Sequence, residues 1–181
     1  MKKIFLLLIV IFIAFAAYVA SRPSDFTVTR SAILNASPEA VFNQVNNFHH
    51  WNNWSPWAKL DPNAKNSFEG PNSGQGAIFR WDGDKNVGAG NMTIVESHPF
   101  EHIGIRLEFI KPFAGVNKTD FTFKPEGKQT LVTWTMSGKN NFIAKAMGIF
   151  IDCDKMIGDM FEKGLAQMKS NVEKAPSDSG I

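Results

Sequence analysis

The residues that could carry out acid–base, nucleophilic or metal chemistry are few and scattered in this sequence. His49 and His50 are adjacent, so on a helix they would point about 100° apart and could not share a metal ion without a third ligand. His98 and His102 flank a turn between two expected strands. We therefore expect exposed or helix-end histidines, no metal site and no cofactor.

The remaining candidates lie together near the C-terminal end. Cys153 is the only cysteine, which excludes an internal disulfide, and no motif around it would activate a nucleophile, so we expect a buried, inert thiol. Asp154 is a weak catalytic candidate because it falls within an apolar series at helical spacing. A buried carboxylate is costly unless it is paired. Pairing with Arg80 or Arg106, exposure at the edge of the stripe, and a ligand-binding or catalytic role all stay open.

Apolar aromatic side chains are the more prominent feature, with 16 Phe and 5 Trp but a single Tyr. Trp and Met suit adaptable apolar pockets, and Trp can also donate a hydrogen bond to a polar ligand group. Each residue taken alone could simply be core. For the set as a whole we predict the lining of a ligand cavity, formed by Trp54, Trp57, Phe79, Trp81, Phe109, Phe121, Trp134, Met136, Met147 and Phe150.

The N-terminal segment, residues 1–21, is predicted to be a signal-anchor that crosses a membrane. An unbroken apolar run from Ile4 to Ala20 follows Lys2 and Lys3, and as a helix it would reach about 26 Å, close to the thickness of a hydrocarbon core. The two lysines favour the cytoplasmic side, which places the domain on the periplasmic or extracytoplasmic side. Cleavage and secretion is the alternative, but Tyr18 is too large for the usual cleavage pattern.

The rest of the chain suits one domain, residues 26–174, joined by a linker at 22–25 and followed by a flexible tail at 175–181. Of the 19 basic residues, Lys2 and Lys3 belong to the anchor, so 17 basic residues face 17 acidic ones in the exported part. A formally neutral domain without runs of Lys or Arg is not expected to bind nucleic acid.

The periodicity of the apolar residues predicts an α+β fold. A strand at 26–34 precedes a helix at 38–45, for which Ser37 is the expected N-cap, and a second helical turn at 48–54. Six alternating segments between 67 and 138 predict an antiparallel sheet with one apolar face. Spacings of three and four then predict one long helix over 140–173, in which Gly148, Gly158 and Gly164 either allow close approach of the sheet or mark bends.

This order, together with several sequence words, resembles the SRPBCC superfamily of START, pollen-allergen-like and polyketide cyclase/dehydrase-like proteins. The segment 30–42 (RSAILNASPEAVF) resembles the first strand and helix, and 51–57 (WNNWSPW) resembles the second helix and its loop. The segments 81–90, 121–127 and 132–134 match later strands and turns, and 154–165 resembles the last helix. The likeness is strongest to membrane-anchored bacterial members.

The resemblance implies a helix-grip fold, in which a curved antiparallel sheet of about seven strands wraps around a long C-terminal helix, with an apolar ligand cavity between them. We expect a membrane-tethered, non-enzymatic protein that binds a small hydrophobic molecule such as a lipid. Two alternatives remain: an enzyme acting on such a ligand, such as a cyclase, dehydratase or hydrolase, and a module that binds a partner protein.

Overall fold

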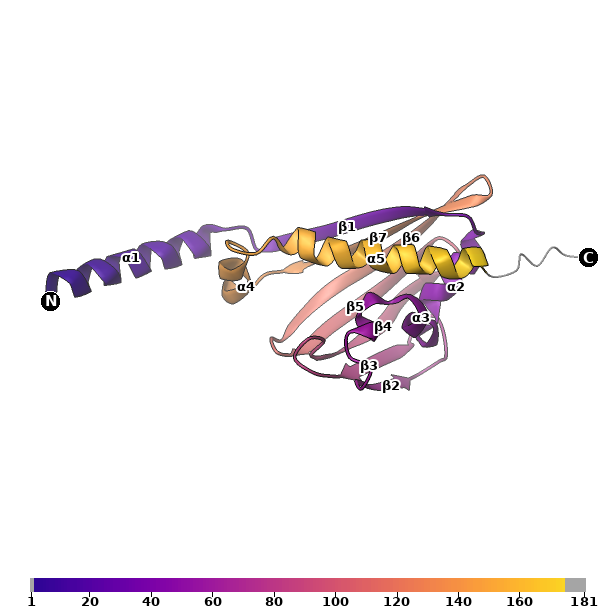
Figure 1. Ribbon diagram of the computed structural model, residues 1–181, viewed down its shortest axis with the longest axis horizontal. Coiled ribbons are helices and arrows are strands. Elements are labelled where there is room, and N and C mark those ends of the chain that lie inside the picture. The colour runs from indigo at the N-terminus through magenta and orange to yellow at the C-terminus, as the bar shows by residue number, and fades with distance from the viewer. Residues whose placement is uncertain (1, 175–181) are drawn as a thin grey trace, which may run out of the picture.

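The computed structural model describes residues 2–174, so the tail predicted at 175–181 lies outside the described residues (Figure 1). Helix α1 (Lys2–Ser21) projects away from the rest of the chain, and Val19 near its end is its one buried residue. By length and apolar composition α1 can span a membrane, a criterion that a cleaved signal sequence also meets.

A single antiparallel sheet of seven strands forms the body of the domain, in the order β1-β7-β6-β5-β4-β3-β2. Apart from β1, which returns to pair with β7, each strand pairs with its neighbour in the sequence. This confirms the predicted fold class, a curved sheet with a long C-terminal helix. The strands are β1 (Asp25–Leu34), β2 (Lys65–Glu69), β3 (Ile78–Asp82), β4 (Ala89–His98), β5 (His102–Lys111), β6 (Gly115–Glu126) and β7 (Gln129–Lys139).

Short helices close one end of the concave face of the sheet. They are α2 (Pro38–Asn46), η1 (Phe48–His50), α3 (Trp51–Trp54) and η2 (Pro56–Lys59). Ser37 caps α2 as predicted, because its side chain accepts a hydrogen bond from the amide of Ala40. The indole N–H groups of Trp51 and Trp54 donate to backbone carbonyls of α2 at 2.9 Å, which fixes these rings against the helix.

The C-terminal helix is not continuous, which corrects the prediction of one helix over 140–173. Helix α4 (Phe142–Met147) ends at Gly148, and α5 (Cys153–Lys174) begins after a break. The Asp152 carboxylate accepts a hydrogen bond from the Lys155 amide at 2.9 Å, as an N-cap does. A new helix therefore starts at this point even though the apolar spacing continues through it.

Helix α5 runs along β1 and crosses the concave face, while β2 to β5 curve away beneath it (Figure 1). Its buried residues are Gly158, Phe161, Gly164, Leu165, Met168 and Val172. Phe161 stacks on Trp134 of β7 with ring centroids 4.0 Å apart and planes 7° apart. A Cβ at Gly164 would lie 3.0 Å from the Trp134 ring, so this glycine allows the helix to pack closely on the sheet. Close approach is one of the two roles predicted for the glycines of this helix.

Candidate functional site

The sheet register brings apolar side chains from distant strands into one row on the concave face. Phe79 pairs with Met92, Met92 with Leu107, and Leu107 with Asn117. Asn117 pairs in turn with Gly138, opposite Phe26. Phe79, Leu107 and Phe26 pack against the core yet stay partly exposed.

A second, shorter row adjoins the first on the same face. Trp81 pairs with Gly90, which pairs with Phe109, and the Trp81 and Phe109 rings meet edge-on with centroids 6.1 Å apart. A Cβ at Gly90 would lie 2.5 Å from the Trp81 ring, so only glycine leaves room for the indole to lie flat across β4. The indole N–H donates to the Val87 carbonyl at 3.1 Å.

The predicted aromatic set therefore divides into two environments. Trp54, Phe121, Trp134 and Met136 are buried in the core, and the three aromatic rings among them pack directly on one another beneath α5. Trp57, Phe79, Trp81 and Phe109 remain partly exposed. The hollow expected directly under the helix is thus filled, around Trp134 and Phe161, by the protein's own side chains. Two partly exposed residues of the first row, Phe79 and Leu107, and two of the second row, Trp81 and Phe109, lie outside this filled region. We call these four residues the open row.

Trp134 carries one unusual polar atom. The residue is 2% exposed, and its Nε1 is buried without a hydrogen-bond partner among residues 2–174. Buried donors normally have partners, because leaving one unpaired costs about 1–3 kcal/mol. Stacking of the ring between Phe121 and Phe161 holds it in place despite that cost.

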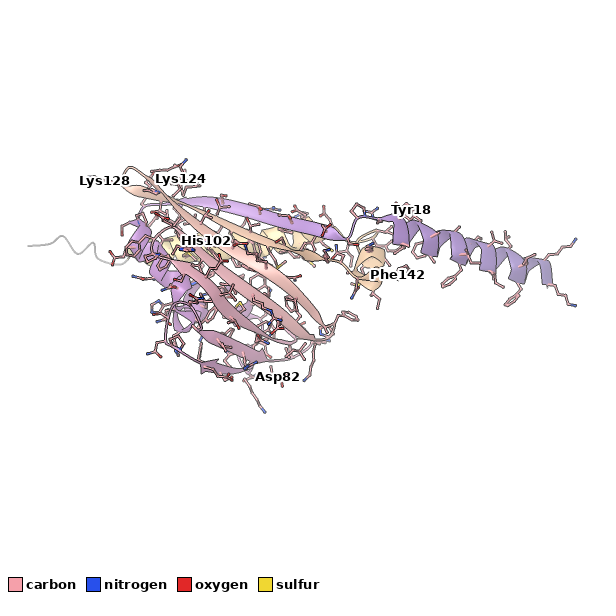
Figure 2. The ribbon with its side chains drawn as sticks, turned by 180° about the vertical axis from the view of Figure 1, so that it is seen from behind. Tyr18, Asp82, His102, Lys124, Lys128 and Phe142 are labelled. Carbon is pink, nitrogen blue, oxygen red and sulfur yellow. The ribbon has the colours of Figure 1, made fainter. Side chains whose placement is uncertain are left out.

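Met147 and Phe150 do not face the interior, which corrects their predicted placement. Met147 is 44% exposed and Phe150 is 80% exposed. The break between α4 and α5 interrupts the helical phase, so residues before it no longer follow the stripe of α5. With Phe142, Ile143 and Ile151 they form an exposed apolar group, here called the α4 patch. Lys145 donates to the Ala20 carbonyl, and Phe142 lies beside the end of α1 near Tyr18 (Figure 2).

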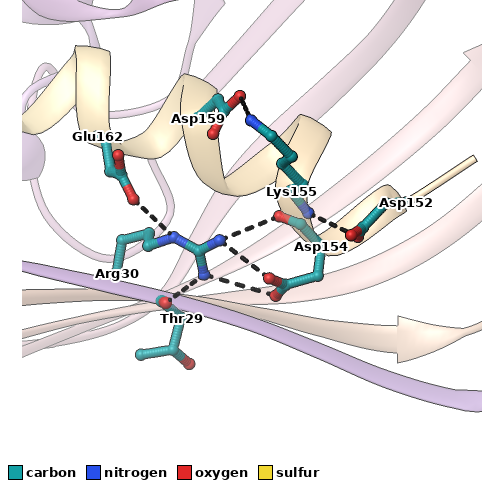
Figure 3. Close-up of polar contacts among 7 residues, drawn as sticks. All are labelled: Thr29, Arg30, Asp152, Asp154, Lys155, Asp159 and Glu162. Carbon is teal, nitrogen blue, oxygen red and sulfur yellow. Dashed lines mark hydrogen bonds and ion pairs between the residues drawn. The ribbon is translucent and has the colours of Figure 1, made fainter.

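Asp154 is paired, but with neither of the arginines considered from the sequence. Its carboxylate lies 2.9 Å from Nη2 of Arg30, which projects from β1 and also binds Glu162 at 2.9 Å (Figure 3). These acids raise the pKa of Arg30, chiefly through the hydrogen bond to Asp154. The Asp154 side chain is 59% exposed, so it sits at the edge of the stripe as a structural partner.

The other chemical candidates lie away from the open row. Cys153 is exposed, so the expectation of a buried thiol is wrong. A depression of about 560 Å³ lies nearby, between the linker, α4 and the start of α5, with Arg22, Lys145 and Asp152 among its lining residues. Arg106 pairs with Glu108 on the convex face. His98 and His102 also face each other on the convex side, across the β4–β5 hairpin.

Sequence reasoning missed three residues that shape this face. Arg30 is a polar residue on β1, but its phase places it with Val28 and Ala32 on the inner side. Leu107 and Phe26 lie in predicted strands but are not among the predicted site residues. Only the register of strand pairing shows that they belong to this face, and a single sequence does not specify that register.

The model of the family described as polyketide cyclase / dehydrase and lipid transport matches residues 25–173. Protein CV1439 from Chromobacterium violaceum is 16% identical, with 81% of this chain and 96% of that chain covered at a TM-score of 0.60. The Aha1 dimer from Colwellia psychrerythraea is 15% identical, with 84% and 99% covered, also at 0.60.

The di-domain ARO/CYC BexL of the BE-7585A biosynthetic pathway is 16% identical at a TM-score of 0.60, with 87% of this chain but 53% of that chain covered. Similarity at these identities establishes a shared fold. Among curated proteins, none matched the sequence. The family match spans the whole domain and confirms the resemblance to the SRPBCC superfamily. The chain belongs to the polyketide cyclase / dehydrase and lipid transport family.

Proposed function

We propose that this protein binds a small hydrophobic molecule, such as a lipid, on the part of the concave face that α5 leaves uncovered. The observation that carries the proposal is the open row. Phe79, Trp81, Leu107 and Phe109 share a face with the core but keep part of their surface in water. The family description, which includes lipid transport, supports the same class of ligand.

The driving force would be the removal of this apolar surface from water. Aromatic side chains offer about 150–250 Å² each, and burial contributes about 25 cal/mol per Å². Covering a further 200 Å² of protein surface would contribute about 5 kcal/mol before the costs of association. That is enough for a weak to moderate carrier without a closed cavity, and it suits a ligand that must be released again.

Asn117 offers the ligand a polar contact. It lies between Leu107 and Gly138 in the longer row, and its side chain occupies the space that a Cβ at Gly138 would take. An amide can donate and accept, so it suits a hydroxyl, carbonyl or carboxyl head on an otherwise apolar molecule. We infer a ligand with one polar end.

The membrane would be both the source of the ligand and the support of the protein. Helix α1 serves as the anchor in this proposal, and the α4 patch continues the apolar surface where α1 meets α4. Exposed aromatic and aliphatic groups beside a membrane helix favour the interfacial layer. The domain would thus rest on the side from which a lipid arrives.

An enzyme of the cyclase type is the second candidate, favoured by the likeness to ARO/CYC proteins of biosynthetic pathways. Such an enzyme needs an acid or base within reach of the ligand. Asp154 is engaged by Arg30, and the imidazole of His102 lies on the opposite face of the sheet. Binding without chemistry therefore accounts better for the described residues.

The test uses the full chain in lipid nanodiscs and the apolar fluorophore N-phenyl-1-naphthylamine. We expect W81A and F109A to weaken binding of the probe at least tenfold with little change in thermal unfolding. I33A is the control, because Ile33 is an exposed apolar residue on the convex face. Equal binding by all variants would refute the proposal. Native mass spectrometry of the same samples, with lipid extraction, identifies any bound molecule.

A further inference from the structure

A cluster of metal-ligating side chains lies on the convex face, far from the open row, where β4, β5 and β6 run side by side. One ligand atom from each of Glu96, His98 and His102 lies within 4.8 Å of the others. His98 and His102 are directly paired across the hairpin, with ring centroids 6.0 Å apart. His102 Nδ1 is 3.7 Å from the Glu96 carboxylate.

A β-bulge brings Glu96 into this cluster. Ile94 pairs with Ile105, yet the next pair is Glu96 with Gly104, so Val95 is an extra residue in β4. In an unbroken register Glu96 would oppose Ile103 and point toward the core. Bulges re-aim side chains in this way, and they recur beside functional sites.

Asp120 of β6 sets the orientation of the His102 ring. Its Oδ1 lies 2.7 Å from His102 Nε2. An ionised carboxylate only accepts hydrogen bonds, so Nε2 is the donor in this contact, and Nδ1, which lies on the side of Glu96, is the nitrogen left for a metal ion. Metal-bound histidines almost always have such a carboxylate or carbonyl partner on their other nitrogen. Lys118 Nζ lies 3.1 Å from the same Asp120 oxygen.

Gly104 places no side chain between the ligands. Gly104 lies between Glu96 and Asp120 in the register, and a Cβ there would be 3.4 Å from both a Glu96 carboxylate oxygen and His102 Cε1. The hairpin is also anchored, since the Phe100 ring at its tip packs edge-on against Phe42 with centroids 5.6 Å apart. A side chain at residue 104 would crowd the space between the ligands.

We propose that Glu96, His98 and His102 form a binding site for a divalent transition-metal ion, with Asp120 as the positioning residue for His102. Two imidazoles and one carboxylate suit Zn²⁺, with water completing a tetrahedral shell. Ligand atoms around tetrahedral Zn²⁺ lie about 3.3 Å apart. Glu96 and His98 are exposed, so rotation about their side-chain bonds can shorten the present separations of the ligand atoms, which are within 4.8 Å, to this distance.

The experiment titrates Zn²⁺ into untagged full-length protein in nanodiscs by isothermal calorimetry, and Co²⁺ in parallel for its visible absorption spectrum. We expect one ion per chain. E96Q, H98N and H102N each abolish the tight phase and the tetrahedral Co²⁺ bands. D120N keeps all three ligands and weakens binding about 10- to 100-fold. The control H49N/H50N removes the other two histidines and leaves the affinity unchanged.

Two results would overturn the proposal: an affinity that E96Q and H102N leave unchanged, or a loss of the tight phase in H49N/H50N. A D120N variant that binds as tightly as the parent chain would reject the positioning role. Circular dichroism of every variant without metal separates loss of a ligand from loss of the fold, and the exposure of Glu96 and His98 predicts unchanged spectra for their variants.

Discussion

The side chain of Arg30 on β1 packs directly against Gly158 on α5. The guanidinium of Arg30 occupies the place that a Cβ at residue 158 would take, and from there it reaches acids on both sides, Asp154 and Glu162 (Figure 3). One glycine thus lets a charged strand residue lie flat across a helix. The pairing fixes where along β1 the helix rests, and so which part of the concave face stays open.

We expect G158A to destabilise the domain by about 1–3 kcal/mol, the usual range when a group is forced into filled space. Helix propensity alone would predict a stabilised variant, because alanine is about 1 kcal/mol more favourable than glycine in a helix. Chemical denaturation followed by circular dichroism measures it. The control is G115A, because a Cβ at Gly115 would meet no atom within 4 Å. A stabilised G158A would contradict this view of the contact.

Replacement of Trp134 should act on stability, whereas replacement of Trp81 should act on binding. W134A removes a ring that is 2% exposed and stacked on two others, so we expect a loss of about 3–5 kcal/mol in unfolding free energy. Trp81 and Phe79 are partly exposed, and W81A or F79A should cost clearly less stability while reducing probe binding more. Parallel losses in both measurements would mark the open row as ordinary core.

The pair Glu69–Arg80 should respond to acid. Arg80 lowers the pKa of Glu69 below its ordinary value of 4.5, first through the hydrogen bond and then through its charge. A depressed carboxyl pKa contributes stability above pH 4.5 that is lost as the pH falls through the lower value. We expect an NMR titration of the Glu69 carboxyl to show a midpoint below 4.5, and R80Q to return it toward 4.5.

Asp159 serves as the internal reference in that titration. The hydrogen bond from Lys155 lowers its pKa below 3.8, and Arg80 takes no part in this. Its midpoint should therefore be the same in the parent chain and in R80Q. A shift of both carboxyls on R80Q would indicate a change in the fold and not the loss of one ion pair.

The proposed contact of the α4 patch with a membrane can be probed with the protein's own thiol. Cys153 is the only cysteine and is exposed beside Phe150 and Ile151. A spin label on Cys153 of the full chain in vesicles should be more accessible to lipid-soluble oxygen than to a water-soluble nickel complex. The control C153S/A166C carries the label at an exposed position farther along α5 and should show the reverse. Equal accessibility at the two positions would show that the patch does not contact the membrane.

Local patterns carried most of the architecture. Alternation in β1 and β3 to β7, the Ser37 cap and the 3–4 spacing of Phe161, Leu165 and Met168 each follow from contacts near in sequence. The break before α5 did not follow, because apolar residues continue through it and only the Asp152 cap marks a new start.

The candidate site was less accessible to sequence reasoning because it depends on pairing between distant strands. Knowing that Phe79 and Phe109 face inward does not say that α5 covers Trp134 and leaves them open. The partner of Asp154 was missed for the same reason, since Arg30 lies 124 residues away. The bulge at Val95, which turns Glu96 outward, likewise leaves no signature in one sequence.

The break between α4 and α5 also sets the orientation of the domain relative to α1. Helix α5 starts beside the end of α1 and then runs away from it for 22 residues, about 33 Å, toward the end where α2 and the Lys124–Lys128 hairpin lie (Figures 1 and 2). If α1 is embedded in a membrane, the basic hairpin that carries Lys124 and Lys128 lies a full domain length away from the lipid. A partner that engages them would need to reach equally far from the same bilayer, or approach from the opposite side.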